Sequence, residues 1–591
     1  MNVLRSPITL VLLLSLSTGC SDSVLDLNPQ DQVSDDAVWS DPALAKAFLF
    51  DIYRGVGHGY NGTTLWVLTD DGHNTRGGDV SDHNLSNVSP SDLQAMGGSR
   101  FSHYRWGDLY KSIRNANIFI TEIEKADFPE AEANQMKGEA LFLRAYFYHN
   151  LLRVFGGVPL ITEVYGLNDD YRVARNSFAE VVDQIVSDLD QAAALLPLEY
   201  PASELGRITK GAALALKARV LLYAASDLYQ TNPSGMPETG YTGGTDRTAY
   251  WRAAKDAAKA VIDLGIYSLY GGDASTPEEG TENYANLFLT KVNPEFIFVR
   301  YFLPHRDDIP NVGRYVGPNG YHNWGSNTPT QNLIDAYRMV DGTPFDWSNP
   351  EHAAAPYENR DPRFYASIQY DGARWVKRPA DVIHLDTAGI IQTFRTLTLP
   401  DGSTLPGLDT RYGPVEDWNG TYSGYYLRKQ VDPTVDHQFV SQDVPWVFIR
   451  YAEVLLNYAE ASIELNELDD ALWAINQIRR RSGMPELSAS LGQDALREEY
   501  RNERRVELAF EEHRFFDVRR WMIAPEVMDE NAHGIEITVK ATDPLRRSTY
   551  YDYTYKIIDV EERHWDDRMY FLPISRDELN RNDALVQNPG Y

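Results

Sequence analysis

The sequence predicts a mostly α-helical fold, in which stacked helical pairs form a scaffold that carries a large irregular, loop-rich lobe with short β segments. Alanine-rich segments with helical periodicity occupy about residues 37–265 and 442–525. The remaining segments, about 266–441 and 526–591, are rich in Pro, Gly, Asn, Asp and Tyr. Hydrophobic residues make up 43% of the chain, which excludes a disordered protein.

The helices of the predicted scaffold are recognised by apolar residues three and four positions apart. In GAALALKARVLLYAAS, one buried face is expected to hold Leu214, Ala218, Leu221 and Ala225. Further helices are expected over about residues 132–155, 178–195, 250–264 and 496–521. A short strand is expected within EFIFVRYF, at the beginning of the irregular lobe.

The segment FIRYAEVLLNYAEASIELNELDDALWAINQIRRRSG predicts a helical hairpin. Two apolar stripes are separated by the polar break NELDD; the first holds Phe448, Ala452, Leu455 and Ala459, and the second holds Ala471, Ile475 and Ile478. A unit of about 35 residues with small side chains at the crossing points is similar to a tetratricopeptide repeat. We therefore expect a tetratricopeptide-like scaffold that is interrupted by insertions.

The N-terminal segment resembles a bacterial lipoprotein signal. Arg5 precedes an apolar run from Ile8 to Leu16, and the small residues of LSTGC lead to Cys20, the single cysteine of the chain. The apolar run is shorter than the ~20 residues of a membrane-spanning helix. We interpret residues 1–19 as the signal peptide and 20–36 as a lipidated tether; an ordinary signal peptide with an incidental thiol is the alternative.

The charge and the motifs of the chain exclude several classes of function. The net charge is −30, and no basic run is present to hold a nucleic acid. The motifs GxSxG, HExxH, GxxxxGK[ST] and CxxC are absent from the sequence, so we expect no enzyme. The mixed-charge run REEYRNERRVELAFEEHRFFDVRR is interpreted as a solvated face with surface ion pairs.

The only metal considered is calcium, which prefers oxygen ligands. The segment DTRYGPVEDWNGTYSG offers Asp409, Glu416, Asp417 and Asn419 within a short stretch. Because their spacing follows no fixed ligand register, the absence of a cofactor remains the main expectation, with structural calcium as the alternative.

Several segments together resemble the SusD/RagB family of Bacteroidetes surface lipoproteins. They occur in the following order along the chain: LDLNPQDQVSDDAVWSDP, KGEALFLRAYFYHNLLRVFGGVPLI, RITKGAALALKARVLLYAAS, RYAEVLLNYAEASIELNE, ERRVELAFEEHRFFDVRRW and FLPISRDELNRNDALVQNPGY. The resemblance implies one SusD-like domain over residues 37–591, with four tetratricopeptide-like helical pairs and an irregular ligand lobe.

The same resemblance implies a function and a location. Family members bind oligosaccharides or polysaccharides without cleaving them, at the outer face of the outer membrane, beside a SusC-like TonB-dependent transporter. Some members bind peptides instead. The alternatives to glycan capture are therefore peptide capture, a glycoside hydrolase, and a protein that acts mainly as a lid on the transporter.

A sugar-binding surface needs flat aromatic rings, amides and arginines on loops that a rigid scaffold supports. Two stretches have this composition. The first, residues 60–84, offers Tyr60, Trp66, Asp70, His73, Asn74, Arg76 and Asp79; the second, residues 313–332, offers Arg314, Tyr315, Tyr321, His322, Asn323, Trp324 and Asn327. Trp324 is the strongest candidate for a stacking platform, followed by Tyr321 and Arg76. Trp106, which falls at core spacing on a helix, is interpreted as structural.

Overall fold

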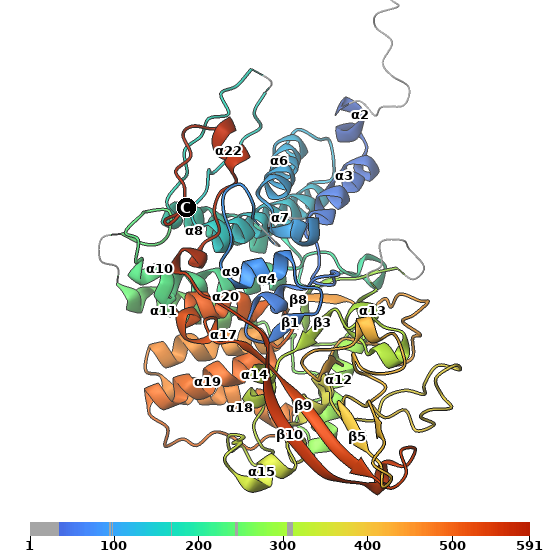
Figure 1. Ribbon diagram of the computed structural model, residues 1–591. Coiled ribbons are helices and arrows are strands. Elements are labelled where there is room, and N and C mark those ends of the chain that lie inside the picture. The colour runs from blue at the N-terminus through green and yellow to red at the C-terminus, as the bar shows by residue number, and fades with distance from the viewer. Residues whose placement is uncertain (1–34, 94–95, 97–98, 167, 243–245, 304–310) are drawn as a thin grey trace, which may run out of the picture.

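The computed structural model describes residues 35–93, 96, 99–166, 168–242, 246–303 and 311–591. The predicted signal peptide and Cys20 therefore lie outside the described residues. Within them the chain is mostly helical, as the sequence predicts. The helices stack in one half of the molecule, and the loop-rich lobe with its strands fills the other half (Figure 1).

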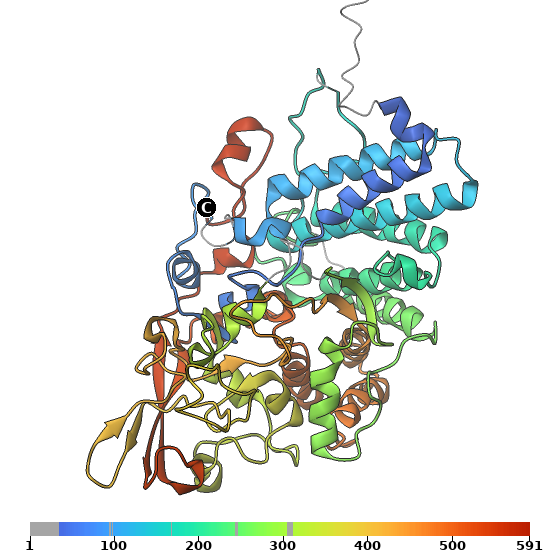
Figure 2. The same cartoon turned by 90° about the vertical axis from the view of Figure 1, so that its right-hand side faces the viewer.

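The scaffold consists of helices that follow one another in a continuous stack. They are α3 (Pro42–Arg54), α6 (Trp106–Ile123), α7 (Glu130–Phe155), α8 (Phe178–Leu195), α9 (Lys210–Ala225), α11 (Arg247–Ile262), α17 (Tyr451–Glu464), α18 (Leu468–Arg481) and α19 (Gln493–Glu507). Each packs on the next from α6 to α17, and α17 packs on both α18 and α19 (Figures 1 and 2). Neighbours in this stack thus include α11 and α17, although residues 263–450 separate them in sequence.

Side chains at the helix starts explain several of these boundaries. Ser177 and Glu180 form a capping box at the start of α8, and Thr209 accepts a hydrogen bond from the backbone of Ala212 at the start of α9. The predicted ranges of α7, α8 and α11 agree with the structure within about three residues, the usual uncertainty of helix ends. The predicted buried face of α9 is only partly correct: Ala218 and Ala225 are buried, whereas Leu214 and Leu221 lie on the one partly exposed stripe of a helix that is otherwise buried on nearly all sides.

The predicted hairpin is confirmed as α17 and α18. The expected stripe positions within these helices are fully buried: Ala452, Leu455, Ala459, Ala471, Ile475 and Ile478. Phe448, which we placed on the first helix, instead belongs to the strand that leads into it. The predicted strand is also present, as β2 (Phe296–Arg300), which pairs antiparallel with β8 (Trp446–Arg450).

The prediction of one continuous helix over residues 496–521 is wrong. The structure has α19, which ends at Glu507, and α20 (His513–Arg520), with a tight turn between them. Phe510 and Glu512 in this turn have positive φ angles of 67° and 66°, which a right-handed helix does not allow. The turn aims the Glu511 carboxylate at Arg450 and Lys429, in the interior of the protein.

The loop-rich lobe contains one sheet of four strands in the order β10–β9–β5–β6. The strands are β5 (Thr396–Thr398), β6 (Thr404–Leu405), β9 (Ala532–Ala541) and β10 (Tyr550–Glu561). Strands β9 and β10 form the long hairpin at the end of the lobe, and β5 joins β9 in parallel (Figures 1 and 2). Two smaller pairs join β1 (Gly72–Asn74) to β3 (Asn327–Pro329) and β4 (Ile368–Gln369) to β7 (Tyr426–Leu427).

Short helices connect the main elements. They are α2 (Asp35–Ser40), α4 (Asp79–Asn84), α10 (Asp227–Thr231), α12 (Pro277–Leu289), α13 (Val312–Val316), α14 (Gln331–Ala336), α15 (Pro350–Ala354), α16 (Pro362–Ser367), α21 (Ala524–Val527) and α22 (Arg576–Arg581). Of these, α12 packs on α16, and α14 contacts both β9 and α19. The contact between α14 and α19 thus attaches the lobe to the scaffold.

A buried network of ion pairs joins the scaffold to the lobe, and we call it the ionic core. It is centred on Glu507, whose carboxylate is fully buried and contacts Arg450, Arg481 and Arg363. The other members are Glu295, Asp361, Lys429, Arg479, Glu503 and Glu511. The interpretation of the mixed-charge run as a solvated face is therefore wrong, because its carboxylates reach across the fold to arginines of other segments.

The electrostatics of the ionic core favour the ionised carboxylate. Burial by itself would raise the pKa of Glu507, but the charges of Arg481, Arg450 and Arg363 lower the pKa well below its ordinary range. The carboxylate is thus charged at neutral pH, and each arginine depends on it for compensation.

We expect the substitution Glu507→Gln to destabilise the protein by about 3–5 kcal/mol, because it removes the buried carboxylate that three guanidinium groups share and leaves their positive charge in excess. The change in the free energy of unfolding can be measured by denaturation with urea. The matched control is Glu498→Gln on the same helix, whose side chain is 74% exposed and which should change the stability by less than about 0.5 kcal/mol. Equal effects of the two substitutions would contradict a structural role of the ionic core.

Candidate functional site

The fold brings the two predicted ligand-contact stretches together. Strands β1 and β3 pair so that His73 lies opposite Thr328 and Asn74 opposite Asn327. The Asn74 amide donates to the Asn327 side chain at 2.9 Å, and the Thr75 backbone amide donates to Ser326 at 2.9 Å. The sequence could not show this pairing, because about 250 residues separate the strands.

Most residues of the first stretch are buried by neighbouring side chains. Trp66 is 3% exposed and meets the Phe510 ring edge-to-face at 4.9 Å between centroids. Asp70 forms ion pairs with Arg514 at 2.7 Å and with Arg505 at 2.9 Å. Both side chains hold the turn after α19 against the lobe, so we no longer assign them to ligand contact.

His73, Asn74 and Tyr60 are also closed off from solvent. Burial lowers the pKa of His73 to about 4, so its imidazole is neutral at pH 7. Tyr60 packs against Trp446 and donates its hydroxyl to the Pro445 carbonyl at 3.1 Å. The expectation that these three side chains contact a ligand is replaced by structural roles.

In the second stretch, Tyr321 and Asn323 are buried as well, with exposed fractions of 6% and 5%. The Tyr321 ring lies under the guanidinium of Arg378, and its hydroxyl donates to the Val376 carbonyl at 2.8 Å. Tyr321 therefore has a structural role in this loop and is not assigned to ligand contact. Trp106, interpreted as structural, packs edge-to-face on Phe155 at the start of α6.

Four residues of the two stretches form a partly exposed cluster around Trp324. The Tyr315 ring meets Trp324 edge-to-face at 5.2 Å between centroids. The guanidinium carbons of Arg76 and Arg314 lie 5.3 Å and 5.5 Å from the centre of the Trp324 ring. Arg76 is exposed and is oriented by a 3.0 Å hydrogen bond from its Nε to Ser326.

A third segment, which we had considered only for calcium, contributes exposed aromatic rings beside this cluster. Gly325 contacts the backbone of Asn419 so closely that a Cβ atom would lie 2.6 Å from the Asn419 carbonyl oxygen. Trp418 is 67% exposed and Tyr422 is 44% exposed. The Tyr422 ring lies 5.6 Å from His73 of β1, between ring centroids. We call Tyr315, Trp324, Trp418 and Tyr422, with Arg76 and Arg411, the aromatic surface.

The side chain of Arg411 holds the segment around Trp418 in place. Arg411 donates to the Trp418 carbonyl at 3.1 Å, and its guanidinium carbon lies 4.1 Å from the centre of the Tyr422 ring. The sequence signal for this segment was its Tyr and Trp content between turn residues, which we overlooked in favour of its carboxylates.

The structure does not support the calcium alternative. The Asp409 carboxylate is fully buried and forms an ion pair with Arg378 at 2.7 Å. Glu416 contacts the His322 ring at 3.0 Å and accepts a 3.0 Å hydrogen bond from the Asn419 amide. Across the residues that the structure describes, no group of three or more His, Cys, Asp or Glu side chains is placed to hold a metal ion.

His322 joins two loops next to Trp324. Its Nδ1 lies 3.0 Å from Glu416 and its Nε2 lies 3.0 Å from Asp381. Partial burial would lower the pKa of His322, but the hydrogen bonds with Glu416 and Asp381 and the charges of both carboxylates raise it above the ordinary value. The ring thus connects the segment of Glu416 to the loop of Asp381, and the raised pKa favours its protonated form.

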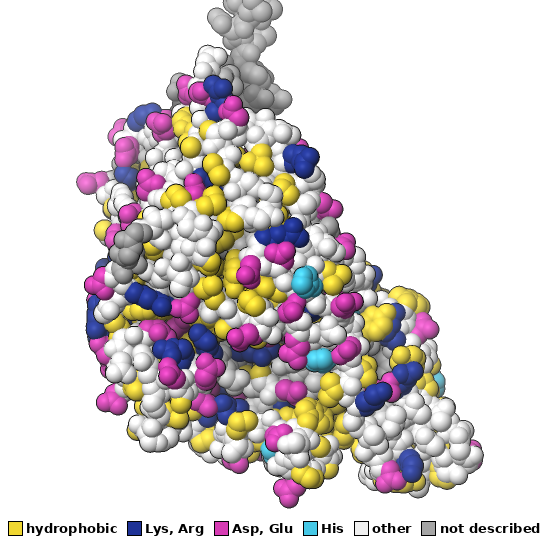
Figure 3. All heavy atoms as spheres, turned by 60° about the vertical axis from the view of Figure 1, so that its left-hand side comes forward, with side chains coloured by type: hydrophobic (Ala, Val, Ile, Leu, Met, Phe, Trp, Pro, Cys, Tyr) yellow, Lys and Arg dark blue, Asp and Glu magenta, His cyan; other side chains and the backbone are white. Residues whose placement is uncertain are grey.

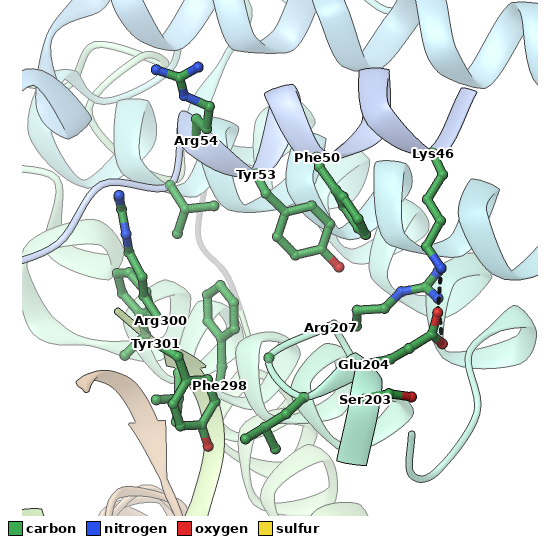
Figure 4. A pocket seen from close by; sticks show the side chains of 15 residues that line it. Lys46, Phe50, Tyr53, Arg54, Ser203, Glu204, Arg207, Phe298, Arg300 and Tyr301 are labelled. Atoms are coloured by element: carbon green, nitrogen blue, oxygen red, sulfur yellow. Dashed lines mark hydrogen bonds and ion pairs between the residues drawn. The ribbon is translucent and has the colours of Figure 1, made fainter. Parts of the chain in front are cut away.

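A cavity of about 430 Å³ lies elsewhere, between α3, residues 203–207 and β2. Its walls are largely aromatic, with Phe50, Tyr53, Phe298 and Tyr301 around the opening (Figure 4). Lys46 and Arg207 in its wall both pair with Glu204, and Arg54 and Arg300 also line it. Because this cavity has no side-chain amide in its described lining and its carboxylate, Glu204, is already paired, the aromatic surface is the better candidate site.

The face of the molecule in Figure 3 carries acidic and basic side chains side by side, with hydrophobic ones scattered between them. No continuous basic field covers the part of this face that the structure describes. This distribution agrees with the net charge of −30 and offers no surface for a nucleic acid there.

Two family models match the chain. The model of the SusD family matches residues 294–591, and a model described as starch-binding associating with outer membrane matches residues 30–222. The two matched ranges include most of the loop-rich lobe and the first half of the helical scaffold.

Several known proteins are similar over nearly the whole chain. A crystal structure of a SusD-like protein from Bacteroides fragilis is 31% identical and has a TM-score of 0.75, covering 95% of this chain and 100% of the other. A SusD-like carbohydrate binding protein from the same species is 25% identical, with a TM-score of 0.71 and coverage of 93% and 99%. The SusD-like protein P38 of Formosa agariphila is 25% identical over 88% of this chain and 92% of its own length.

We expect the contact between His322 and Glu416 to weaken with rising pH. Because the folded-state pKa of His322 is raised, its contribution is complete below the unfolded value of about 6.5 and is lost as the pH rises through the folded value. Hydrogen exchange of residues 412–422 should therefore differ between wild type and His322→Gln at about pH 6, and converge by about pH 9.

The matched control is His564→Gln, since His564 also pairs with a carboxylate at 3.0 Å but is 63% exposed. This substitution should leave exchange in residues 412–422 unchanged at both pH values. A difference between wild type and His322→Gln that persists undiminished at about pH 9 would show that the charge of His322 does not hold the loop.

Proposed function

The chain belongs to the SusD family, and on this premise we propose that it is a non-enzymatic glycan-binding lipoprotein of the outer membrane. It captures oligosaccharides or polysaccharides at the cell exterior and delivers them to a SusC-like TonB-dependent transporter. The aromatic surface is the observation that carries this proposal. The carbohydrate-binding description of the similar protein from Bacteroides fragilis supports it.

The chemistry of the aromatic surface suits a sugar chain. The flat rings of Trp324, Trp418 and Tyr422 can stack on the C–H faces of sugar units, which are apolar. Arg76 and Arg411, whose guanidinium groups lie over the rings of Trp324 and Tyr422, can donate hydrogen bonds to sugar hydroxyls. The loops that present them rest on paired strands and on buried side chains, so the surface needs little ordering when it binds.

Three carboxylates of the loops around His322 and Tyr321 are already engaged, which argues against the glycoside hydrolase alternative. Glu416 and Asp381 share the His322 ring, and Asp409 is paired with Arg378. A hydrolase of the usual kind needs one protonated and one free carboxyl group on either side of the scissile bond. We therefore propose capture without cleavage at this surface.

The location rests on the sequence. Cys20, the proposed lipid attachment site, and the tether that follows it precede the described residues. Within the described part of the chain, every helix is too short or too polar to cross a membrane. The family model for outer-membrane association supports a lipid anchor as the link to the bilayer.

We expect Trp324→Ala to bind the cognate polysaccharide about 5- to 30-fold more weakly than wild type, since one stacking ring contributes about 1–2 kcal/mol. Affinity electrophoresis through gels with a panel of plant, algal and microbial polysaccharides measures the retardation, with an assay for reducing ends in parallel. The control is Trp473→Ala, which removes a 47% exposed tryptophan ring from α18, away from the aromatic surface.

The same experiment separates the alternatives. Retardation without release of reducing ends supports glycan capture, and release of reducing ends would favour a hydrolase. If no polysaccharide retards the protein but a peptide digest evolves heat in calorimetry, peptide capture replaces the proposal. Equal retardation of Trp324→Ala and wild type would remove Trp324 from the binding surface.

For the anchor, we expect Cys20→Ala in the full chain to abolish acylation and to move the protein from the membrane fraction to the soluble fraction. The physical reason is that acyl chains, at ~0.8 kcal/mol per buried CH₂ group, supply the membrane affinity. Fractionation and labelling with a fatty-acid analogue measure both effects. The control is Ser21→Ala, which leaves the thiol in place; retained acylation of the Cys20→Ala protein would contradict the anchor.

A further inference from the structure

A second cavity in the loop-rich lobe has the composition of a binding site for an anion. It has a volume of about 310 Å³ and lies between α12, α16 and the segments around residues 374–376 and 428–433. Its polar lining consists of Arg374, Arg428, Asn286 and Gln430, and Trp375 supplies the large aromatic ring. None of these residues belongs to the aromatic surface or lines the cavity of Figure 4.

The charge of this cavity is opposite to that of the whole chain. The protein has 85 acidic and 55 basic residues, yet the described lining contains two arginines and no carboxylate. Elsewhere in the interior, arginines of the ionic core are compensated by carboxylates, as Arg450 is by Glu295, Glu507 and Glu511. The cavity therefore keeps a positive charge that the fold itself does not neutralise.

Neither arginine of the cavity is committed to an acidic partner. Arg428 is half-buried and donates to the Tyr365 carbonyl at 2.6 Å, and burial lowers its pKa. The exposed side chain of Arg374 has neither a hydrogen bond nor an ion pair with any described residue. Both guanidinium groups can therefore donate to a ligand, in the planar geometry that matches a carboxylate or a sulfate.

The side chain of Gln430 is a second, independent observation that indicates a ligand site. Its side chain is 3% exposed, and its Nε2 donor has no hydrogen-bond partner in the described structure. A buried donor without a partner costs about 1–3 kcal/mol. Gln430 also has a φ angle of 65°, a strained conformation for a residue other than glycine. Its carbonyl is fixed by a 2.6 Å hydrogen bond from Gln442, so the strain is held in place by its neighbours.

We propose that this cavity binds an oxyanion, a carboxylate or a sulfate ester, on a sugar ring that stacks against Trp375. Arg374 and Arg428 bind the oxyanion, and the Gln430 amide donates to it or to a neighbouring hydroxyl. The proposal that the oxyanion is attached to a sugar rests on the proposed function. The preference for an oxyanion rests on the cavity alone. The site allows a chain of net charge −30 to retain an acidic glycan that its overall field repels.

Calorimetric titration of the soluble chain that starts after Cys20 tests the proposal. The probes are glucuronate for the carboxylate, glucose 6-sulfate for the sulfate ester and glucose as the neutral reference. We expect heat from at least one of the two anions and none from glucose at the same concentration. The two anionic probes distinguish the source of the oxyanion, and the absence of heat from both would overturn the proposal.

The variant Arg374→Gln assigns the binding to this cavity. Because Arg374 is exposed, the substitution should leave the melting temperature unchanged, and it should weaken binding of the anionic probe at least about tenfold. The matched control is Arg546→Gln, whose side chain is 76% exposed on the β9–β10 hairpin and which should bind as wild type does. Equal binding by Arg374→Gln and wild type would overturn the assignment.

A further measurement distinguishes failure of this inference from failure of the proposed function. Retardation by neutral polysaccharides, measured on the same Arg374→Gln protein, should match wild type, because Arg374 does not belong to the aromatic surface. If the anionic probes bind and no polysaccharide is retarded, the cavity stands and glycan capture fails. If polysaccharides are retarded and neither anion binds, glycan capture stands and this inference fails.

Discussion

The buried contact between Glu507 and the three arginines around it is the constraint on which the rest of the architecture depends. Arg363, Arg450 and Arg481 come from α16, from the end of β8 and from the end of α18, so one carboxylate joins three separate segments. Ionised groups in a protein interior are tolerated only when all of them are compensated. The ionic core therefore fixes where α19 must end and where the lobe must attach.

The same constraint explains why a long lobe can interrupt the helical stack. The lobe leaves after α11 and returns through β8 into α17, and these two helices pack on each other. Pairing of β2 with β8 brings the two ends of the insertion together, and Glu295 and Arg450, at those ends, form an ion pair at 2.7 Å. The loops of the lobe are then free to present side chains, because they do not have to hold the scaffold together.

The two binding surfaces proposed here differ in chemistry. The aromatic surface combines flat rings with arginines that lie over them, and it suits an uncharged sugar chain. The cavity around Arg428 has one ring, two arginines and an unsatisfied amide, which suits a charged group. Together they describe a protein that holds an extended glycan by its faces and an acidic unit by its charge.

The sequence by itself determined the elements whose stability is local. Helix α8 and the hairpin of α17 and α18 follow from capping residues and apolar periodicity, and the order of the segments determined the family. The composition of two separate stretches also identified Trp324 and Arg76 as candidate ligand contacts, but not that they lie together. Periodicity does not show which polar side chains are buried, so the roles of Trp66, Asp70 and Tyr321 in the core could not be predicted. Only the tertiary structure decided that α19 ends at Glu507, that the backbone of Asn419 lies against Gly325, and that Arg504 and Arg520 of the mixed-charge run are internal. Each of these depends on partners far away in the chain.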